Sequence, residues 1–323
     1  MKSKIGIDKK GKLTIIFCVL VVSIACLIGT SFCYAEVVGI WLFDEEGGKI
    51  VTDASGNGHD GEIIGNAARR PNGRFRKAIE FFQDADAEPG ALWPGYVTIR
   101  HHDDQDLLEF SLTAWVKLSD IAGAELNEHR VSIRALIAGK TGHIQQSNYA
   151  LWISGAGQGG GLAGEAGHVT FGFTVSKPKW SQVFVEKTGR RAAVTDGKWH
   201  HVVGTYREPM LYVYVDGTLV GEQENEAVNN PLLPGGKEVP KPTIARSRGK
   251  PGPFMIGAQH IGRQVGTQRP SYGVDGLIDE VGLFNHALTL EEIKQISRRG
   301  LAQFLAVNPR QKLTTTWGAI KRD

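Results

Sequence analysis

Short apolar stretches of strand length, separated by turns rich in glycine, run through the chain from Glu36 to about Phe284. They are rich in β-branched and aromatic residues, which favour strands, and almost no helical periodicity lies between them. The clearest of these stretches are residues 37–43, 78–82, 96–99, 110–118, 134–139, 149–153, 168–175, 199–206 and 211–215. Many short strands in succession predict an all-β domain, either a sandwich or a barrel.

Two local motifs predict where individual elements turn or end. In the last of these stretches apolar and less apolar residues alternate, and Asp216-Gly217 then supplies the two positive-φ residues of a tight hairpin. Near the C-terminus, Thr289 and Glu292 have the spacing of a helix capping box, and Gly300 is placed to end that helix. We therefore expect one short C-terminal helix beside the strands.

The first 35 residues have the pattern of a secretory signal peptide. Five lysines precede a long apolar run, and the run ends in Cys33-Tyr34-Ala35, with a small residue before the expected cut. We expect cleavage between Ala35 and Glu36, no membrane insertion afterwards, and a secreted, periplasmic or cell-surface location. The run is also long enough to remain as a single membrane anchor, and that alternative stays open.

Removing residues 1–35 changes the composition of the chain. All three cysteines lie in this segment, so the mature protein has no disulfide and must rely on its hydrophobic core. The mature chain keeps 32 Lys+Arg against 33 Asp+Glu, because five of the 37 basic residues and one of the 34 acidic residues are removed. This balance gives no electrostatic reason to expect nucleic acid as a partner.

A series of motifs in the mature chain resembles the laminin-G-like jelly-roll family, within the concanavalin-A-like lectin and glucanase superfamily. In chain order they are GIWLFDEEGG, DASGNGHDGEIIG, KAIEF, GYVTI, FSLTAWVKL, DGKWHHVVGTY, LYVYVDGTLVG, FMIGA and GLIDEVGLFNHALTLEEI. The resemblance implies an all-β jelly-roll β-sandwich of two antiparallel sheets, with the chain ends close together. It supports a domain over residues 36–300 and leaves unexplained the tail 301–323 and three insertions, at 119–132, 154–167 and 222–253.

The glycine-rich loop DASGNGHDGEIIG, residues 53–65, is the first candidate site. The resemblance implies that it lies near the end of the first strand and close to the last one, where family members often hold a structural calcium ion. Calcium takes six to eight oxygen ligands, and the side chains that we expect to converge are Asp44, Asp53, Asn57 and Asp279. The alternative is that Asp53 and Asn57 only hydrogen-bond their own backbone in successive turns. Both interpretations stay open.

The glucanases of the same superfamily provide a motif with which this sequence can be compared for catalytic residues. These retaining enzymes carry two glutamates on one strand in the pattern Glu-x-Asp-x-x-Glu. The nearest match is LIDEVG, where Asp279 aligns but Leu277 and Gly282 stand at the two glutamate positions. The sequence therefore predicts a protein that is not an enzyme.

The histidine pairs give no convincing metal site. His200 and His201 are neighbours on a predicted strand, so their side chains point to opposite faces and cannot bind one metal together. We expect one of them to be packed and the other exposed. His101 and His102, followed by two aspartates, come directly after a strand and predict a solvated turn.

Sugar binding needs exposed aromatic side chains beside hydrogen-bonding groups. Trp93, Tyr96, Trp180 and Tyr272 lie in or beside loops and are the candidates for ligand contact, whereas Trp41, Trp115 and Trp199 occupy strand motifs and are expected in the core. The sequence thus favours an exported, non-catalytic recognition module that binds a glycan, or a glycosylated or matrix-like extracellular protein, through loops at one rim. Two alternatives are a polysaccharide-degrading enzyme with an unrecognised site and a cell-surface structural protein whose tail docks to a neighbour.

Overall fold

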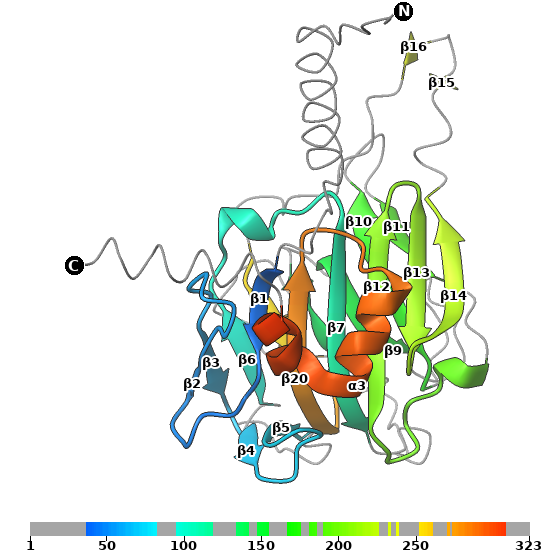
Figure 1. Cartoon of the computed structure of the whole chain (residues 1–323). Helices are drawn as coiled ribbons and strands as arrows, with labels where there is room; N and C mark the ends of the chain where they lie inside the picture. The colour runs from blue at the N-terminus through cyan, green and yellow to red at the C-terminus, as the bar shows by residue number, and fades with distance from the viewer. Residues whose placement is uncertain are drawn as a thin grey trace, which may run out of the picture. The chain divides into compact units, whose positions relative to one another are not determined.

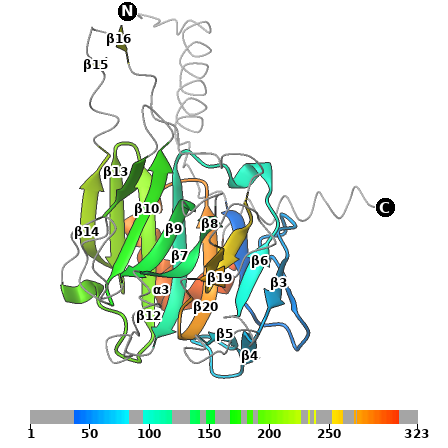
Figure 2. The ribbon, with the colours of Figure 1, turned by 180° about the vertical axis from the view of Figure 1, so that it is seen from behind.

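Two antiparallel sheets of eight strands each form the body of the domain (Figures 1 and 2). The computed structural model describes residues 37–82, 95–118, 134–141, 147–154, 167–175, 181–185, 190–225, 232–233, 237–238, 252–260, 270–271 and 273–307. The predicted signal peptide, most of the three insertions and the end of the tail lie outside these residues.

Sheet A holds the longest strands, and it includes β1 and β20, the first and last strands of the described chain. Its strand order is β14-β13-β12-β7-β20-β5-β4, and β1 also pairs with β20. The bounds are β1 Val37–Trp41, β4 Ala68–Arg70, β5 Ala78–Phe81, β7 Phe110–Leu118, β12 His200–Arg207, β13 Met210–Val215, β14 Thr218–Glu224 and β20 Gly276–Phe284. The expected hairpin is confirmed, because Asp216 and Gly217 both have positive φ and join β13 to β14.

Sheet B covers one face of sheet A. Its order is β11-β10-β9-β8-β17-β6-β3-β2. The bounds are β2 Ile50–Val51, β3 Gly61–Ile64, β6 Tyr96–Ile99, β8 Arg134–Thr141, β9 Ser147–Ser154, β10 Val169–Val175, β11 Ser181–Phe184 and β17 Phe254–Ile256. Two separate two-stranded sheets pair β15 (Leu232–Leu233) with β16 (Lys237–Glu238) and β18 (Gln259–His260) with β19 (Pro270–Ser271).

The main core lies between the two sheets and is rich in aromatic rings. The ring of Phe110 on β7 lies 4.6 Å from that of Tyr149 and 5.5 Å from that of Phe171, both on sheet B. Trp41 stacks on Phe254 at 5.1 Å. Because these rings come from both sheets, their burial holds the sandwich together without a disulfide.

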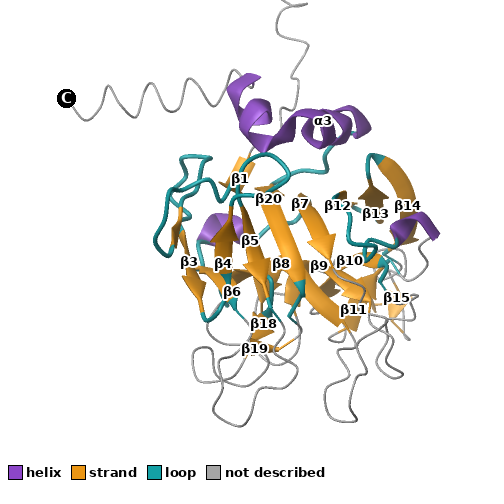
Figure 3. Ribbon diagram, turned by 90° about the horizontal axis from the view of Figure 1, so that it is seen from below, coloured by secondary structure: helices purple, strands orange, loops and turns teal. Residues whose placement is uncertain are grey.

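One α-helix, α3 (Leu290–Val307), lies on the outer face of sheet A (Figure 3). Its capping box is confirmed, since the Thr289 backbone N–H donates to the Glu292 carboxylate at 2.8 Å. The helix breaks at Gly300, as predicted, but resumes and continues to Val307. Gly300 has φ 78°, and a Cβ there would lie 2.6 Å from a carboxylate oxygen of Glu280, so only glycine fits.

The predicted fold class is therefore confirmed in its sheets and in its C-terminal α-helix. Two 3₁₀ turns, η1 (Asp103–Gln105) and η3 (Arg190–Ala192), complete the described helices. None of the helices in the described part of the chain has the length and apolar composition of a membrane span.

Candidate functional site

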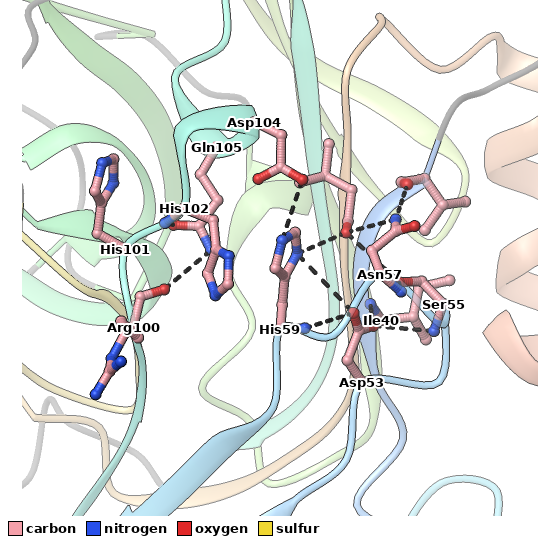
Figure 4. A network of polar contacts seen from close by, with 12 residues as sticks. Ile40, Asp53, Ser55, Asn57, His59, Arg100, His101, His102, Asp104 and Gln105 are labelled. Atoms are coloured by element: carbon pink, nitrogen blue, oxygen red, sulfur yellow. Dashed lines mark hydrogen bonds and ion pairs between the residues drawn. The ribbon is translucent and has the colours of Figure 1, made fainter. Parts of the chain in front are cut away.

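The glycine-rich loop folds back against the first strand, as expected, and Asp53 is its anchor (Figure 4). One oxygen of the buried Asp53 carboxylate accepts the backbone N–H groups of Ile40 and Ser55, at 3.0 and 2.9 Å. Its other oxygen accepts the backbone N–H of His59 at 3.0 Å. The Asn57 amide nitrogen donates to the carbonyl oxygens of Val37 and Val38. Asp53 and Asn57 thus hold the loop on β1 through main-chain groups.

His59 connects this loop to the turn after β6. Its side chain is buried, with Nδ1 2.8 Å from the Val38 carbonyl oxygen and Nε2 3.1 Å from a carboxylate oxygen of Asp104 in η1 (Figure 4). Both ring nitrogens face oxygen atoms, so the two contacts fix the orientation of the ring. The His102 ring lies 4.3 Å from that of His59. The turn that was expected to be solvated is thus the 3₁₀ turn η1, and the contact between His59 and Asp104 joins it to the loop. No local sequence pattern indicates this contact.

The other two predicted metal ligands lie together around the loop that joins β4 to β5. Asp44 accepts the backbone N–H of Lys77 at 3.2 Å, and one oxygen of Asp279 accepts that of Phe75 at 3.1 Å. The second Asp279 oxygen, Oδ1, is buried and has no hydrogen-bond partner among the described residues. Burial raises the pKa of Asp279 to about 7, and the nearby Asp44 charge adds to the shift.

These contacts divide the four predicted calcium ligands into two pairs. Asp53 and Asn57 already face backbone groups, whereas the unpartnered oxygen of Asp279 beside Asp44 has the chemistry of a cation ligand. Among the described residues, no three His, Cys, Asp or Glu side chains gather closely enough to form a metal site by themselves. Calcium binding therefore stays a prediction, and it now rests on Asp44 and Asp279.

Of the four predicted ligand-binding aromatics, only Tyr96 lies within the described residues. It is half-buried on the outer face of sheet B, where it packs against a small apolar cluster that includes Trp152 and Met255. Trp93, Trp180 and Tyr272 fall outside the described part of the chain. Their role in ligand contact stays a prediction.

A groove on the opposite side of the sandwich was not foreseen from the sequence. It has a volume of about 530 Å³ and lies between α3 and the outer face of sheet A; it is lined by Arg74, Trp115, Trp199, Asp216, Ser297 and Arg298. The prediction that Trp199 lies in the core is wrong, because its side chain is half-exposed just before β12. Trp115 is buried, as expected, but on the outer face of β7 and in the groove wall.

The groove combines aromatic faces with charged groups. The Arg74 guanidinium lies 4.5 Å above the Trp115 ring, and the Trp115 Nε1–H is buried without an acceptor among the described residues. Asp216 accepts from His200 at 2.8 Å, and this hydrogen bond raises the pKa of His200. A volume of this size suits a small ligand or a short chain segment.

Beside the groove, the His200–His201 pair divides as expected, one packed and one partly exposed. His201 is fully buried under the Trp115 ring, with the two ring centroids 5.2 Å apart, and burial lowers its pKa to about 3. Its Nε2 lies 2.6 Å from the Thr113 hydroxyl. His201 is therefore a neutral, structural histidine.

Two solved structures are similar to this chain at low sequence identity. The binding domain of Paraclostridial Mosquitocidal Protein 1 matches with a TM-score of 0.50 and 11% identity, over 81% of this chain and 51% of that one. Domain 4 of a GH43 extracellular arabinanase from Geobacillus stearothermophilus, solved with arabinotriose, matches with a TM-score of 0.47 and 19% identity, over 81% of this chain and 98% of that one. The chain spans about half the length of the binding domain of that mosquitocidal protein.

The likeness to the mosquitocidal protein's binding domain shows the fold alone, because the sequence identity is low. A comparison with curated protein sequences gave no match. A laminin G family model, described as the concanavalin A-like lectin/glucanases superfamily, matches residues 94–294. Since this match covers more than half of the chain, the protein belongs to that laminin G family, as its motifs predicted.

Proposed function

We propose that this protein is an exported module that binds glycans and has no catalytic centre of its own. The observation that carries the proposal is the groove, where Trp115 and Trp199 stand beside arginine side chains and a serine. Sugar rings present apolar C–H faces and many hydroxyl groups, so they match aromatic surfaces flanked by hydrogen-bonding groups. Trp199 is the half-exposed indole of the two and is the residue we expect to contact the ligand.

The absence of catalysis is part of the proposal and has its own support. Asp279 and Glu280 are the carboxylates of the strand that resembles the glucanase motif, and both are buried under the α3 side of sheet A. Each accepts a backbone N–H, from Phe75 and Leu301 respectively. A retaining glycosidase needs two carboxylates that reach the same sugar from a solvent-accessible cleft.

Replacing Trp199 by alanine is expected to weaken glycan binding by about tenfold or more, because an aromatic anchor carries a large share of a small interface. The exported protein is purified, its N-terminus is read by mass spectrometry to check for a start at Glu36, and its retention is measured on an array of polysaccharides. Trp199→Phe keeps an aromatic face and should retain most binding. Released reducing sugar is measured in parallel, and we expect none.

The Tyr96→Ala variant is the matched control for the location of the glycan-binding site. It removes the one described aromatic side chain of the predicted rim site, on the opposite face of the molecule. Loss of binding in Tyr96→Ala but not in Trp199→Ala would move the site to the rim. Failure of the wild type to bind any polysaccharide, or sugar release that one carboxylate substitution abolishes, would contradict the proposal.

We also propose that Asp44 and Asp279 bind a structural calcium ion. Calcium that binds only the native state, at a concentration a hundredfold above its Kd, would add about 2.7 kcal/mol to the unfolding free energy. A rise of several degrees in melting temperature should follow for a domain of this size. Thermal melting with calcium and with a chelator measures the effect.

The calcium response should disappear in Asp279→Asn and persist in Asp103→Asn, which changes a fully exposed carboxylate in η1. A wild-type melting temperature that is the same with calcium and with chelator would remove the metal from the proposal. The glycan-binding proposal would not be affected, because the groove and the Asp279 carboxylate are tested separately.

A further inference from the structure

We propose that the groove selects a negatively charged sugar unit, one that carries a carboxylate or a sulfate group. This inference rests on the proposed glycan-binding function and adds the charge of the ligand to it. The two guanidinium groups of the groove, Arg74 and Arg298, carry the argument. They enter from different elements, the β4–β5 loop and α3.

Neither guanidinium is neutralised by a carboxylate of the described residues. Among the described residues, Arg74 and Arg298 form no ion pair, although the two arginines closest in sequence to Arg74 do. Arg70 pairs with Glu80, and Arg76 lies 3.6 Å from Asp44. The side chains around Arg74 therefore include carboxylates, and the fold directs them to other partners.

The single carboxylate in the groove does not cancel this charge. Asp216 is engaged by the His200 ring at 2.8 Å and by the backbone N–H of His201 at 2.9 Å. His200 also lies 3.0 Å from Asp196. Asp216 is thus paired outside the groove, and the two arginines leave the groove with a net positive charge.

Stacking on aromatic rings orients the Arg74 guanidinium for ligand binding. Its guanidinium is held over the Trp115 ring at 4.5 Å and near the Phe75 ring at 5.2 Å, so its position is set by stacking rather than by an ion pair. Stacking occupies the face of the guanidinium and leaves its edge N–H groups to donate. These edge groups match the paired oxygens of a carboxylate or a sulfate.

A second observation also favours a ligand rich in oxygen acceptors. Trp115 is 5% exposed, and its Nε1–H has no acceptor among the described residues. Buried donors are rarely left unpaired, and such groups often mark a site that a ligand or water completes. The buried Trp115 N–H thus adds a donor for a ligand or water to complete, whereas the preference for an acidic sugar over a neutral one rests on the two arginines.

The test compares ligands that differ only in charge. Binding of polygalacturonate oligomers is measured against their methyl esters, and binding of dextran sulfate against dextran, by calorimetry at low and high salt. We expect at least one charged ligand to bind about tenfold or more tightly than its uncharged match. High salt should remove most of that difference, because it screens the exposed arginines. The two ligand pairs distinguish a carboxylate from a sulfate.

Arg298→Gln and Arg299→Gln form a matched pair of variants, since both remove one exposed charge from neighbouring positions of α3 and only Arg298 lines the groove. Arg298→Gln should weaken binding of the charged ligand by about three- to fivefold, and Arg299→Gln should leave it unchanged. Arg74→Gln should act in the same direction as Arg298→Gln.

Equal weakening by Arg298→Gln and Arg299→Gln would show a general charge effect and overturn the inference. Binding of both members of a ligand pair with the same affinity, or of neutral glycans alone, would also overturn it and leave the proposed glycan-binding function standing. If no glycan of either kind binds, both proposals fail together.

Discussion

Raising the pH from about 5 to about 8, with calcium chelated, should lower the unfolding free energy of the wild-type protein more than that of Asp279→Asn. We expect the two losses to differ by about 2–3 kcal/mol. The pKa of Asp279 is about 7 in the folded protein, chiefly because of burial, against an ordinary value of 3.8. The folded state therefore holds a proton that the unfolded chain has already released. Stability from this group is complete below the ordinary pKa and is lost as the pH rises through about 7.

Two neighbouring groups affect the same measurement, which is why the comparison with the variant is needed. Glu280 behaves like Asp279, since burial raises its pKa to about 7 as well. His201 acts in the opposite direction, because burial lowers its pKa to about 3 and its contribution is lost as the pH falls below about 6.5.

Urea unfolding of wild type, Asp279→Asn and the exposed control Asp103→Asn at several pH values isolates the Asp279 contribution. Asp103→Asn should follow the wild type. A pH dependence of Asp279→Asn that matches the wild type would contradict the prediction, and it would mean that Asp279 is ionised in the folded protein throughout this range.

Replacing Asp53 by alanine should destabilise the protein by about 3–5 kcal/mol. The carboxylate is 5% exposed and accepts three backbone N–H groups, from Ile40, Ser55 and His59. Its removal leaves two buried donors, of Ile40 and His59, without their partner, and each such donor costs about 1–3 kcal/mol. The part-buried Ser55 N–H, which water can reach, adds less. The free energy of urea unfolding measures the loss.

Asp60→Ala is the graded control for this prediction. The Asp60 carboxylate is exposed and accepts one backbone N–H, from Asp53, at 2.8 Å. Its removal should cost about 0.5–1.5 kcal/mol, the usual net value of one hydrogen bond. If Asp53→Ala costs no more than Asp60→Ala, Asp53 is not the anchor of the loop.

The strands, the hairpin and the start of the helix could be predicted because their signals are local. Alternating residues mark a half-buried strand, Asp216-Gly217 marks a turn, and the Thr289 and Glu292 spacing marks a cap. The groove could not be predicted in this way. β7 is buried on both faces, under α3 on one side and sheet B on the other, so its sequence shows no alternation that would place Trp115 outside the sandwich.

The loop from Asp53 shows the same limit at a smaller scale. Its glycines predicted turns correctly, and the residues that bind its backbone were among the candidates. No local pattern indicates that His59 reaches Asp104, because that contact joins two segments that are paired only after the sheets have formed. Nor does any pattern of residues predict that one oxygen of Asp279 is left without a hydrogen bond.

The pairing of β1 with β20 also sets the order in which this protein can fold. Val37 lies opposite Phe284, so β1, the first described strand, finds its partner only when β20, the last described strand, has been made. Contacts between such distant segments form slowly, because a long loop must close before they gain any energy. During synthesis β1 therefore has no partner in sheet A until Phe284 has been added. In the export that we propose, this delay would keep sheet A incomplete until most of its strands have been made.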